Sequence, residues 1–114
     1  MNVRSSVALL EQPAAVADHA ESAAMAEVFG LLADPGRLRI LLTLRAGEAN
    51  VGRLSEASGL SESATSHALG LLRARHVVRV RRSGRLAIYQ LADEHVRHVL
   101  DTALDHLRHT GEHR

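Results

Sequence analysis

The C-terminal segment of the chain, residues 92–114, is rich in side chains that bind metal ions. Five of the eight histidines of the 114-residue sequence lie here, and Asp93 precedes the first of them. Imidazole nitrogens and carboxylate oxygens are ordinary ligands of divalent metal ions such as Zn(II). Their spacing decides which of them could share one ion. The five histidines are His95, His98, His106, His109 and His113.

Helical spacing divides these side chains into two groups. His106 and His109 are i,i+3 neighbours, which lie side by side on a helix surface. His95 and His106 share a face, but they are roughly 16 Å apart along the axis at 1.5 Å per residue, too far for one ion. Asp93, at or just before the N-cap, can turn its carboxylate toward His95. One helix therefore carries a half-site at each end.

Two copies of the helix, packed antiparallel, would complete these half-sites. Asp93 and His95 of one chain would then face His106 and His109 of the partner subunit, and symmetry would give two equivalent sites per dimer. Three imidazoles and one carboxylate form a tetrahedral set that suits Zn(II). Without cysteine in the chain, Cu(I) is disfavoured. A solvated, histidine-rich surface helix is the alternative interpretation of the same spacing.

The segments that must position this helix show helical periodicity in the first half of the chain. Residues 1–13 have weak periodicity and predict a flexible N-terminal arm, followed by one domain over 14–114. A helix is expected from Ala14 to Ala33, and another begins at Pro35 with Asp34 as its N-cap and ends at Gly47. The expected buried stripe of this second helix is Leu38, Leu41, Leu42 and Leu44.

The middle of the chain has the pattern of a helix-turn-helix. A helix over Val51–Ser58 stops at Gly59, and the next starts with Ser61 as N-cap and runs to His76. The expected core positions are Leu54, Ala57, Leu60, Ala64, Leu69 and Leu72. The expected exposed positions are Glu62, Ser63, Thr65, Ser66 and His67.

Alternating apolar residues then predict a β-hairpin. Val78 and Val80, then Leu86 and Ile88, flank a turn at residues 83–84, with arginines at the tip. A helix-turn-helix followed by a basic hairpin is a winged helix. The predicted fold is therefore mainly α with a small β-hairpin, in the order ααααββα.

The charge distribution favours a polyanionic partner for this part of the chain. The net charge is only +1, and every basic residue is arginine. Between residues 61 and 90 there are six arginines but one acid, Glu62. Such local asymmetry is typical of nucleic-acid binding, although a solvated basic surface has the same composition.

Three segments carry a family resemblance: LADPGRLRILLTL, LSEASGLSESATSHALGLLRARHVV and RRSGRLAIYQL. They resemble the ArsR/SmtB family of metal-sensing bacterial repressors, from about Ala24 to His109. The resemblance implies a homodimer that binds double-stranded operator DNA when metal-free and releases it on binding metal. Two-fold symmetry predicts an imperfect palindromic operator.

The resemblance also implies site residues. Asp93, His95, His106 and His109 match the family pattern Asp-x-His-x10-His-x2-His/Glu, most similar to zinc- and cobalt-responsive members. Nickel sensors of the family use extra C-terminal histidines, and only His113 could serve here, so Ni(II) is the alternative. The roles of His98 and His19 stay open.

For DNA, the resemblance implies contacts from the recognition helix and the wing. The candidates are Ser63, Thr65, Ser66, His67, Arg73, Arg81, Arg82 and Arg85. It further implies that the imidazole of His106 donates its second N–H to the backbone carbonyl of His76, which would link the metal site to the recognition helix.

Other classes of function are disfavoured by what accompanies the histidines. Four protein ligands would close a zinc site, and no nucleophile motif or Gly-rich loop is present, so we expect neither an enzyme nor an organic substrate. No apolar run reaches the roughly 18 residues of a membrane span, and the N-terminus lacks a convincing signal peptide, which predicts a cytoplasmic protein. A winged-helix regulator that is not controlled by metal is the remaining alternative.

Overall fold

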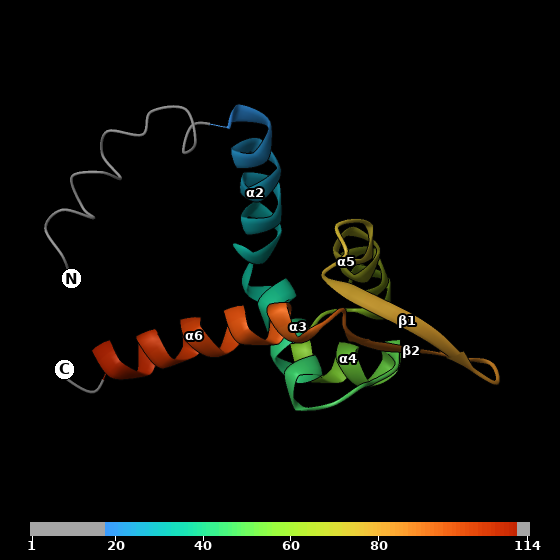
Figure 1. Ribbon diagram of the computed structural model, residues 1–114. Coiled ribbons are helices and arrows are strands. Elements are labelled where there is room, and N and C mark those ends of the chain that lie inside the picture. Colours follow the sequence, from blue (N-terminus) through green and yellow to red (C-terminus); the bar gives the residue numbers. More distant parts are fainter. Residues whose placement is uncertain (1–17, 112–114) are drawn as a thin grey trace, which may run out of the picture. The chain divides into compact units, whose positions relative to one another are not determined.

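The computed structural model describes residues 18–111, which form five helices and one β-hairpin (Figure 1). Two compact units, residues 1–30 and 31–114, are described separately below. The expected N-terminal arm, residues 1–13, and His113 lie outside the described residues. The elements are α2 (His19–Leu32), α3 (Pro35–Ala46), α4 (Val51–Ser58), α5 (Glu62–Ala74), β1 (Val78–Ser83), β2 (Leu86–Leu91) and α6 (Glu94–Gly111). None of these helices is long and apolar enough to cross a membrane.

Helix α2 begins later than the sequence predicts. Asp18 is not helical, and its carboxylate accepts a hydrogen bond from the Glu21 N–H at 3.0 Å, as an N-cap does. A helix that runs through Asp18 from Ala14 is therefore wrong. Met25 and Phe29 of α2 are 53% and 55% exposed.

Helix α3 has the predicted ends. The Asp34 carboxylate accepts a hydrogen bond from the Arg37 N–H at 2.9 Å, and Gly47 follows the last turn. The predicted buried stripe is only half right, because Leu41 and Leu44 are buried whereas Leu38 and Leu42 are half-buried. The fully buried residue that the pattern missed is Ile40. Helix α3 contacts α4, β2 and α6, so its buried face is broader than one stripe.

Helices α4 and α5 form the predicted helix-turn-helix. Gly59 has φ 75°, a left-handed conformation that favours glycine, and its N–H bonds to the Ser55 carbonyl at 3.0 Å. Ser61 caps α5 by accepting a hydrogen bond from the Ala64 N–H at 3.0 Å. The turn is closed by Ser55, whose hydroxyl donates to the Leu60 carbonyl at 2.6 Å.

The face that these helices bury differs in part from the prediction. Leu54, Leu69 and Leu72 are buried as expected, and Leu60 is half-buried. Ala57 and Ala64 are exposed, however, so the prediction is wrong at both positions. In their place, the adjacent Ser58 and Thr65 are buried, together with Ala68.

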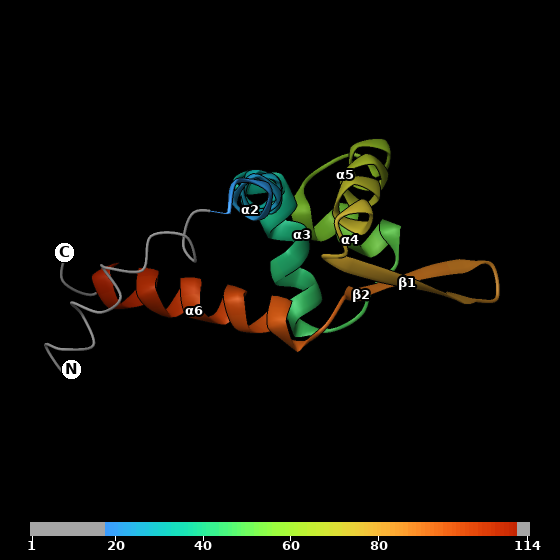
Figure 2. The ribbon, with the colours of Figure 1, turned by 45° about the horizontal axis from the view of Figure 1, so that its top comes forward.

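The hairpin is antiparallel and pairs Val78 with Leu91 and Ser83 with Leu86. Its two-residue turn is therefore Gly84–Arg85, one position later than predicted, and Gly84 has φ 62°, as turns of this kind require. Tyr89 of β2 also exchanges two backbone hydrogen bonds with Ala49, at 2.8 and 3.1 Å. Figures 1 and 2 show the tip of the hairpin projecting beyond α3, α4 and α5.

A tight joint connects α5 to β1. His76 has φ 59°, and its N–H bonds to the Arg73 carbonyl at 3.0 Å, while the Val77 N–H bonds to the Leu72 carbonyl at 2.9 Å. This pair of bonds is the Schellman motif, in which a left-handed residue ends a helix. Leu72 and Val77 are both buried, and the Val77 carbonyl accepts a hydrogen bond from the Ala92 N–H at 3.0 Å.

Helix α6 is attached to α3 by its first half. Leu100 is buried, Arg97 donates to the Arg45 carbonyl at 2.6 Å, and the Arg45 guanidinium pairs with Asp101. From residue 105 onward every described residue of α6 is exposed, and in Figures 1 and 2 this half leads away from the hairpin. The predicted winged helix-turn-helix, closed by a final helix, is confirmed.

Candidate functional site

Asp93 and His95 form the half-site at the beginning of α6. The Asp93 carboxylate caps the helix by accepting a hydrogen bond from the Val96 N–H at 3.1 Å, and the same oxygen lies 3.7 Å from Nδ1 of His95. The Val96 N–H, with a smaller contribution from His95, holds the pKa of Asp93 below its usual value. The cap therefore presents an ionised carboxylate beside an imidazole that is 98% exposed.

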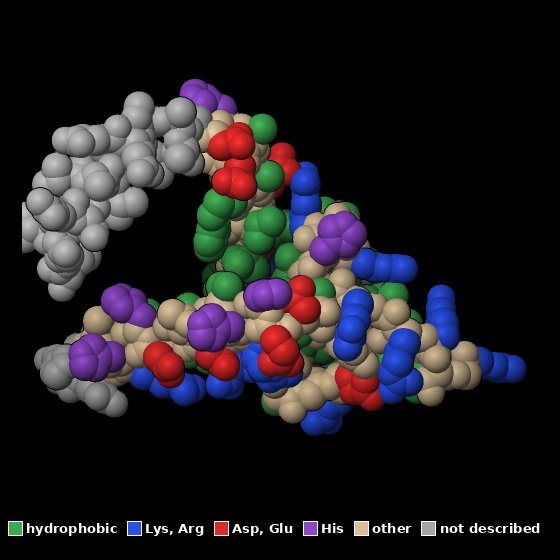
Figure 3. Space-filling view, in the orientation of Figure 1, with side chains coloured by type: hydrophobic (Ala, Val, Ile, Leu, Met, Phe, Trp, Pro, Cys, Tyr) green, Lys and Arg blue, Asp and Glu red, His purple; other side chains and the backbone are tan. Residues whose placement is uncertain are grey.

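His106 and His109 lie three residues apart near the other end of α6, and both are exposed. Figure 3 shows histidine side chains spaced along this helix. Within the described part of a single chain, no three His, Asp or Glu side chains come close enough together to hold one metal ion. Asp93 and His95 thus lie together at one end of α6, His106 and His109 lie three residues apart near the other, and the four do not form one cluster in a single chain.

An apolar stripe joins the two pairs. Val99 and Ala103 are four and eight residues after His95, so they are turned only about 40° and 80° around α6 from it, and they line one shallow groove with His106. Leu107 is turned about 120° from His95 and lies at the edge of this side. All three are exposed, and Val99 and Leu107 are 45% and 64% exposed. The side of α6 that bears the candidate ligands is therefore one that other parts of the chain leave uncovered.

The outer face of α5 presents short polar side chains. Ser63, Ser66 and His67 are exposed, as predicted, and Arg73 is exposed near the end of the helix. Thr65 is not exposed: its relative accessibility is 0%, so the prediction that it lies on the outer face is wrong. The buried positions of α5 are Thr65, Ala68, Leu69 and Leu72. This spacing of three and four residues places Thr65 on the inner stripe.

The wing presents its arginines on two faces. Because side chains alternate along a strand, Arg82 lies on the face of Val78 and Val80, and Arg81 lies on the opposite face. Among the described residues, neither Arg82 nor Arg85 at the turn has an ion-pair partner. Arg81 differs, because its guanidinium donates to both carboxylate oxygens of Glu48, at 2.5 and 3.4 Å.

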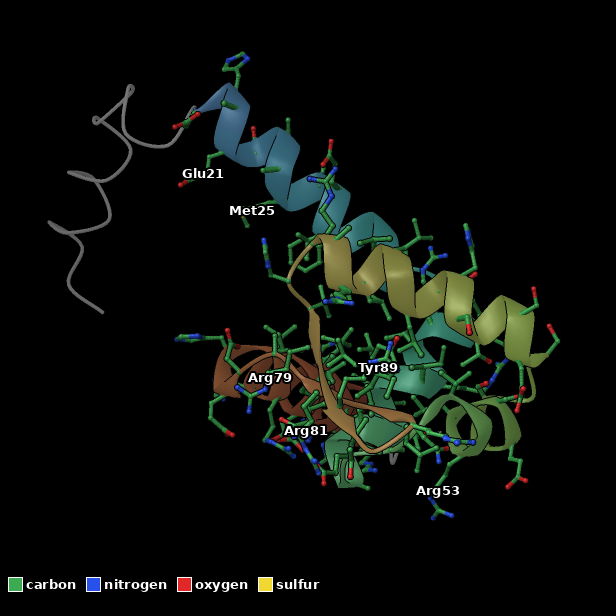
Figure 4. The ribbon with its side chains drawn as sticks, turned by 90° about the vertical axis from the view of Figure 1, so that its right-hand side faces the viewer. Glu21, Met25, Arg53, Arg79, Arg81 and Tyr89 are labelled. Carbon is green, nitrogen blue, oxygen red and sulfur yellow. The ribbon has the colours of Figure 1, made fainter. Side chains whose placement is uncertain are left out.

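Glu48 is a residue that the sequence did not single out. Its carboxylate also accepts a hydrogen bond from the Gln90 amide at 2.6 Å, and Gln90 in turn accepts one from Arg79 at 2.8 Å. The hydrogen bonds from Arg81 and then Gln90 lower the pKa of Glu48. Glu48 and Arg81 are 33 residues apart, so no local pattern reveals the contact. Figure 4 labels Arg79, Arg81 and Tyr89 in this region.

Comparison with known proteins finds regulators of transcription. Residues 34–79 match the family described as bacterial regulatory protein, arsR family. A transcriptional repressor SmtB homolog from Synechocystis sp. is 46% identical over 84 residues, which are 74% of this chain and 64% of that protein. The chain thus spans less than two thirds of the length of this relative. The HTH-type transcriptional regulator NmtR from Mycobacterium tuberculosis is 42% identical over 98 residues, which are 86% of this chain and 82% of that protein.

Solved structures give the same result for the fold. A homodimeric winged helix-turn-helix DNA-binding domain from Mycobacterium bovis superposes with a TM-score of 0.77 at 28% sequence identity. The match covers 88% of this chain and 95% of that structure. The similar proteins are regulators of transcription and not enzymes.

Proposed function

Because this chain belongs to the arsR family of bacterial regulatory proteins, we propose that it is a metal-responsive transcriptional repressor. As a homodimer without metal it binds a palindromic operator, and it releases the operator when Zn(II) occupies two sites shared between the subunits. The observation that carries this proposal is the placement of two ligand pairs at opposite ends of one exposed, partly apolar side of α6.

The proposed dimer contact is the exposed side of α6 that bears the candidate ligands. Val99 and Ala103, on the side of α6 that bears His95 and His106, are exposed in the single chain, and burying them against the same residues of a second α6 removes apolar surface from water. An antiparallel arrangement is self-complementary, as a two-fold contact requires. It sets Asp93 and His95 of one subunit against His106 and His109 of the partner subunit.

The donor set fits Zn(II). The pair at the start of α6 supplies an ionised carboxylate and an imidazole, and the pair near its end supplies two imidazoles. These nitrogen and oxygen ligands close a tetrahedral shell, in which zinc serves as a structural link and not as a catalyst. Co(II) and Ni(II) accept the same ligands and are the alternative metals.

The outer face of α5 and the tip of the wing support operator binding. Ser63, Ser66 and His67 are exposed on one helix, where short polar side chains can reach base edges in the major groove. Arg73, Arg82 and Arg85 are placed to contact phosphates, which position the protein without reading sequence.

The switch acts on the distance between the two α5 helices of the dimer, which are the proposed recognition helices. Joining the ligand pairs fixes how the two α6 helices cross, and each α6 is attached to its own winged helix through Arg45, Arg97 and Leu100. If that crossing fits the operator poorly, metal and DNA weaken each other's binding by the same factor. A hydrogen bond from the His106 imidazole to the His76 carbonyl would strengthen this coupling.

A metal titration combined with a DNA-binding measurement tests the proposal. A duplex selected from a random pool by the metal-free dimer is labelled, and its fluorescence anisotropy is followed with and without Zn(II), Co(II) and Ni(II). We expect two ions per dimer and a loss of DNA affinity of about 5- to 150-fold, the usual range of allosteric coupling. Cobalt spectra report four-coordination if the tetrahedral set is correct.

Two variants of α6 provide the comparison. His106→Gln should bind the duplex normally without metal but bind zinc poorly and release little DNA, whereas His98→Gln should behave as the wild type. A winged-helix regulator without a metal switch would show unchanged DNA affinity in every metal. Full release of DNA by a zinc-loaded His106→Gln dimer would rule out the link to the His76 carbonyl.

A further inference from the structure

Four arginines lie on β1 and the turn of the wing, but they do not have equal access to a binding partner. Arg79 and Arg81 point to the face that holds Gln90 and Glu48, and each makes a side-chain hydrogen bond there. Arg82 lies on the other face, and Arg85 lies in the turn. A wing that looks uniformly basic in the sequence is therefore divided into a paired and an unpaired set, within the part of the chain that the structure describes.

Glu48 owes its position to the backbone beside it. Ala49 exchanges both backbone hydrogen bonds with Tyr89, at 2.8 and 3.1 Å, which makes the α3–α4 loop a short extra edge of the hairpin. Ala49 is buried, so the loop is anchored in the core. The carboxylate of Glu48, the residue before Ala49, is thereby held beside the side chains of Gln90 and Arg81.

The contact with Arg81 is a strong one for a surface ion pair. Exposed pairs commonly contribute little, because two flexible side chains must be ordered in water, and here the side chains are 51% and 43% exposed. The usual exceptions are two-pronged arginine–carboxylate contacts and networks. Glu48 meets both conditions, since Arg81 donates to both of its oxygens and Gln90 adds a third hydrogen bond.

We propose that Glu48 is a positioning residue of the wing, which holds Arg81 away from DNA so that Arg82 and Arg85, and not Arg81, supply the phosphate contacts at the tip of the hairpin. The inference rests on the proposed DNA-binding function and refines it. Glu48 fixes the base of the wing to the winged-helix body, and it also removes one positive charge from each DNA-binding surface. Nonspecific affinity for DNA is thereby kept lower than the number of arginines suggests.

The salt dependence of DNA binding tests this assignment. Each phosphate contact adds about 0.9 to the slope of log K against log salt, so one arginine per wing adds about 1.8 for a dimer with two wings. The probe is a labelled mixed-sequence duplex, and the protein is the metal-free full chain. We expect Arg82→Gln to reduce the slope by about 1.8 and its neighbour Arg81→Gln to leave it unchanged.

Removing Glu48 should have the opposite effect. In Glu48→Ala the Arg81 guanidinium is free to bind phosphate, so the slope should rise by about 1.8 and affinity at low salt should increase. The double variant Glu48→Ala/Arg81→Gln should return to the wild-type slope. Thermal unfolding of each variant checks that DNA binding is measured on a folded protein. The variant Arg81→Lys, which retains the positive charge, is measured in the same way and should also leave the slope unchanged.

The outcomes separate this inference from the proposed function. If Arg81→Gln reduces the slope as much as Arg82→Gln, Arg81 contacts DNA and the inference is wrong while the DNA-binding wing stands. If the gain in Glu48→Ala persists in the double variant, it comes from loss of a negative charge and the inference is also wrong. If neither Arg82→Gln nor Arg85→Gln changes the slope, the wing does not contact phosphate, and the wing's part in the proposed function fails as well.

Discussion

At the scale of single residues, Thr65 shows how closely exposed polar positions and core positions follow one another on α5. Its neighbour Ser66 is exposed, whereas Thr65 has a relative accessibility of 0%. Its hydroxyl oxygen is buried and has no hydrogen-bond partner among the described residues. A buried polar group without a partner costs about 1–3 kcal/mol. The helix therefore carries a polar atom where an apolar one would be more stable.

Thr65→Val replaces that hydroxyl with a methyl group of similar shape. We expect the free energy of unfolding to rise by about 1 kcal/mol, since a desolvated hydroxyl is removed and the branched side chain still fills the space. Urea unfolding measures the change, and DNA affinity should stay at the wild-type level. The matched variant Ser66→Ala should do the reverse, with DNA affinity reduced and stability little changed. A less stable Thr65→Val protein would show that the hydroxyl has a partner after all.

At the scale of elements, α6 consists of an anchored half and an exposed half. Arg45 at the end of α3 accepts a hydrogen bond from Arg97 on its carbonyl and pairs with Asp101 through its guanidinium. The hydrogen bond from Arg45 lowers the pKa of the Asp101 carboxyl from its ordinary value near 3.8. The folded state therefore holds the ionised form of Asp101 more tightly than the unfolded state does.

This difference predicts how stability depends on pH. A carboxyl with a lowered pKa in the folded state stabilises the fold above about pH 3.8, and this contribution is lost as the pH falls from there through the lower, folded-state value. Asp101→Asn should therefore be less stable than the wild type at neutral pH and equal to it in strong acid. The effect should be small, because both side chains are more than a third exposed. Asp105→Asn, one turn further along α6, leaves the contact between Arg45 and Asp101 intact and is the matched control in chemical denaturation.

The same scale shows which features the sequence could predict. Helix ends that are set by a local cap, at Asp34, Gly59 and Ser61, were predicted correctly. The predicted start of α2 at Ala14 and the predicted end of α5 at His76 are wrong, because α2 begins at His19 and α5 ends at Ala74. The face that a helix buries is set by its neighbours in space, and on α5 a shift of one residue, about 100° of rotation, exchanged Ala64 for Thr65. The candidate ligands lie at the N-cap of one helix and along it, so their spacing could be worked out from the helical repeat, while their binding of metal stays a prediction. Glu48 could not be found, because its partner Arg81 is brought to it by the tertiary fold.

At the scale of the whole molecule, the metal sites are predicted to belong to the dimer and not to the chain. One chain with Asp93→Asn and His95→Gln lacks the first ligand pair, and another with His106→Gln and His109→Gln lacks the second. Each variant alone should bind no zinc tightly, because every site in its homodimer is incomplete. In the mixed dimer, one site receives both intact pairs and the other receives none.

A mixed dimer of these two variants should therefore bind one zinc ion, compared with two for the wild type. Subunits carrying different affinity tags allow the mixed dimer to be isolated, and calorimetry counts the ions. A control mixture of wild type with the first variant should also give one site per mixed dimer. If the two variants mixed together restore no binding, the ligand pairs do not meet across the dimer as proposed.

The joint at His76 limits what a regulatory signal can change. Leu72 and Val77 are buried on either side of it. The Val77 carbonyl also accepts a hydrogen bond from the N–H of Ala92, just before α6. Helix α5, the hairpin and α6 therefore meet within a few residues. Because these elements are joined directly, we expect the winged helix to move as one rigid unit, with α5, the hairpin and α6 at fixed angles to one another. In a dimer of two such rigid winged helices, the quantity that can change is the distance between them. Under the proposed function, we therefore expect metal binding to change which spacing between the two half-sites, counted in base pairs, the dimer accepts.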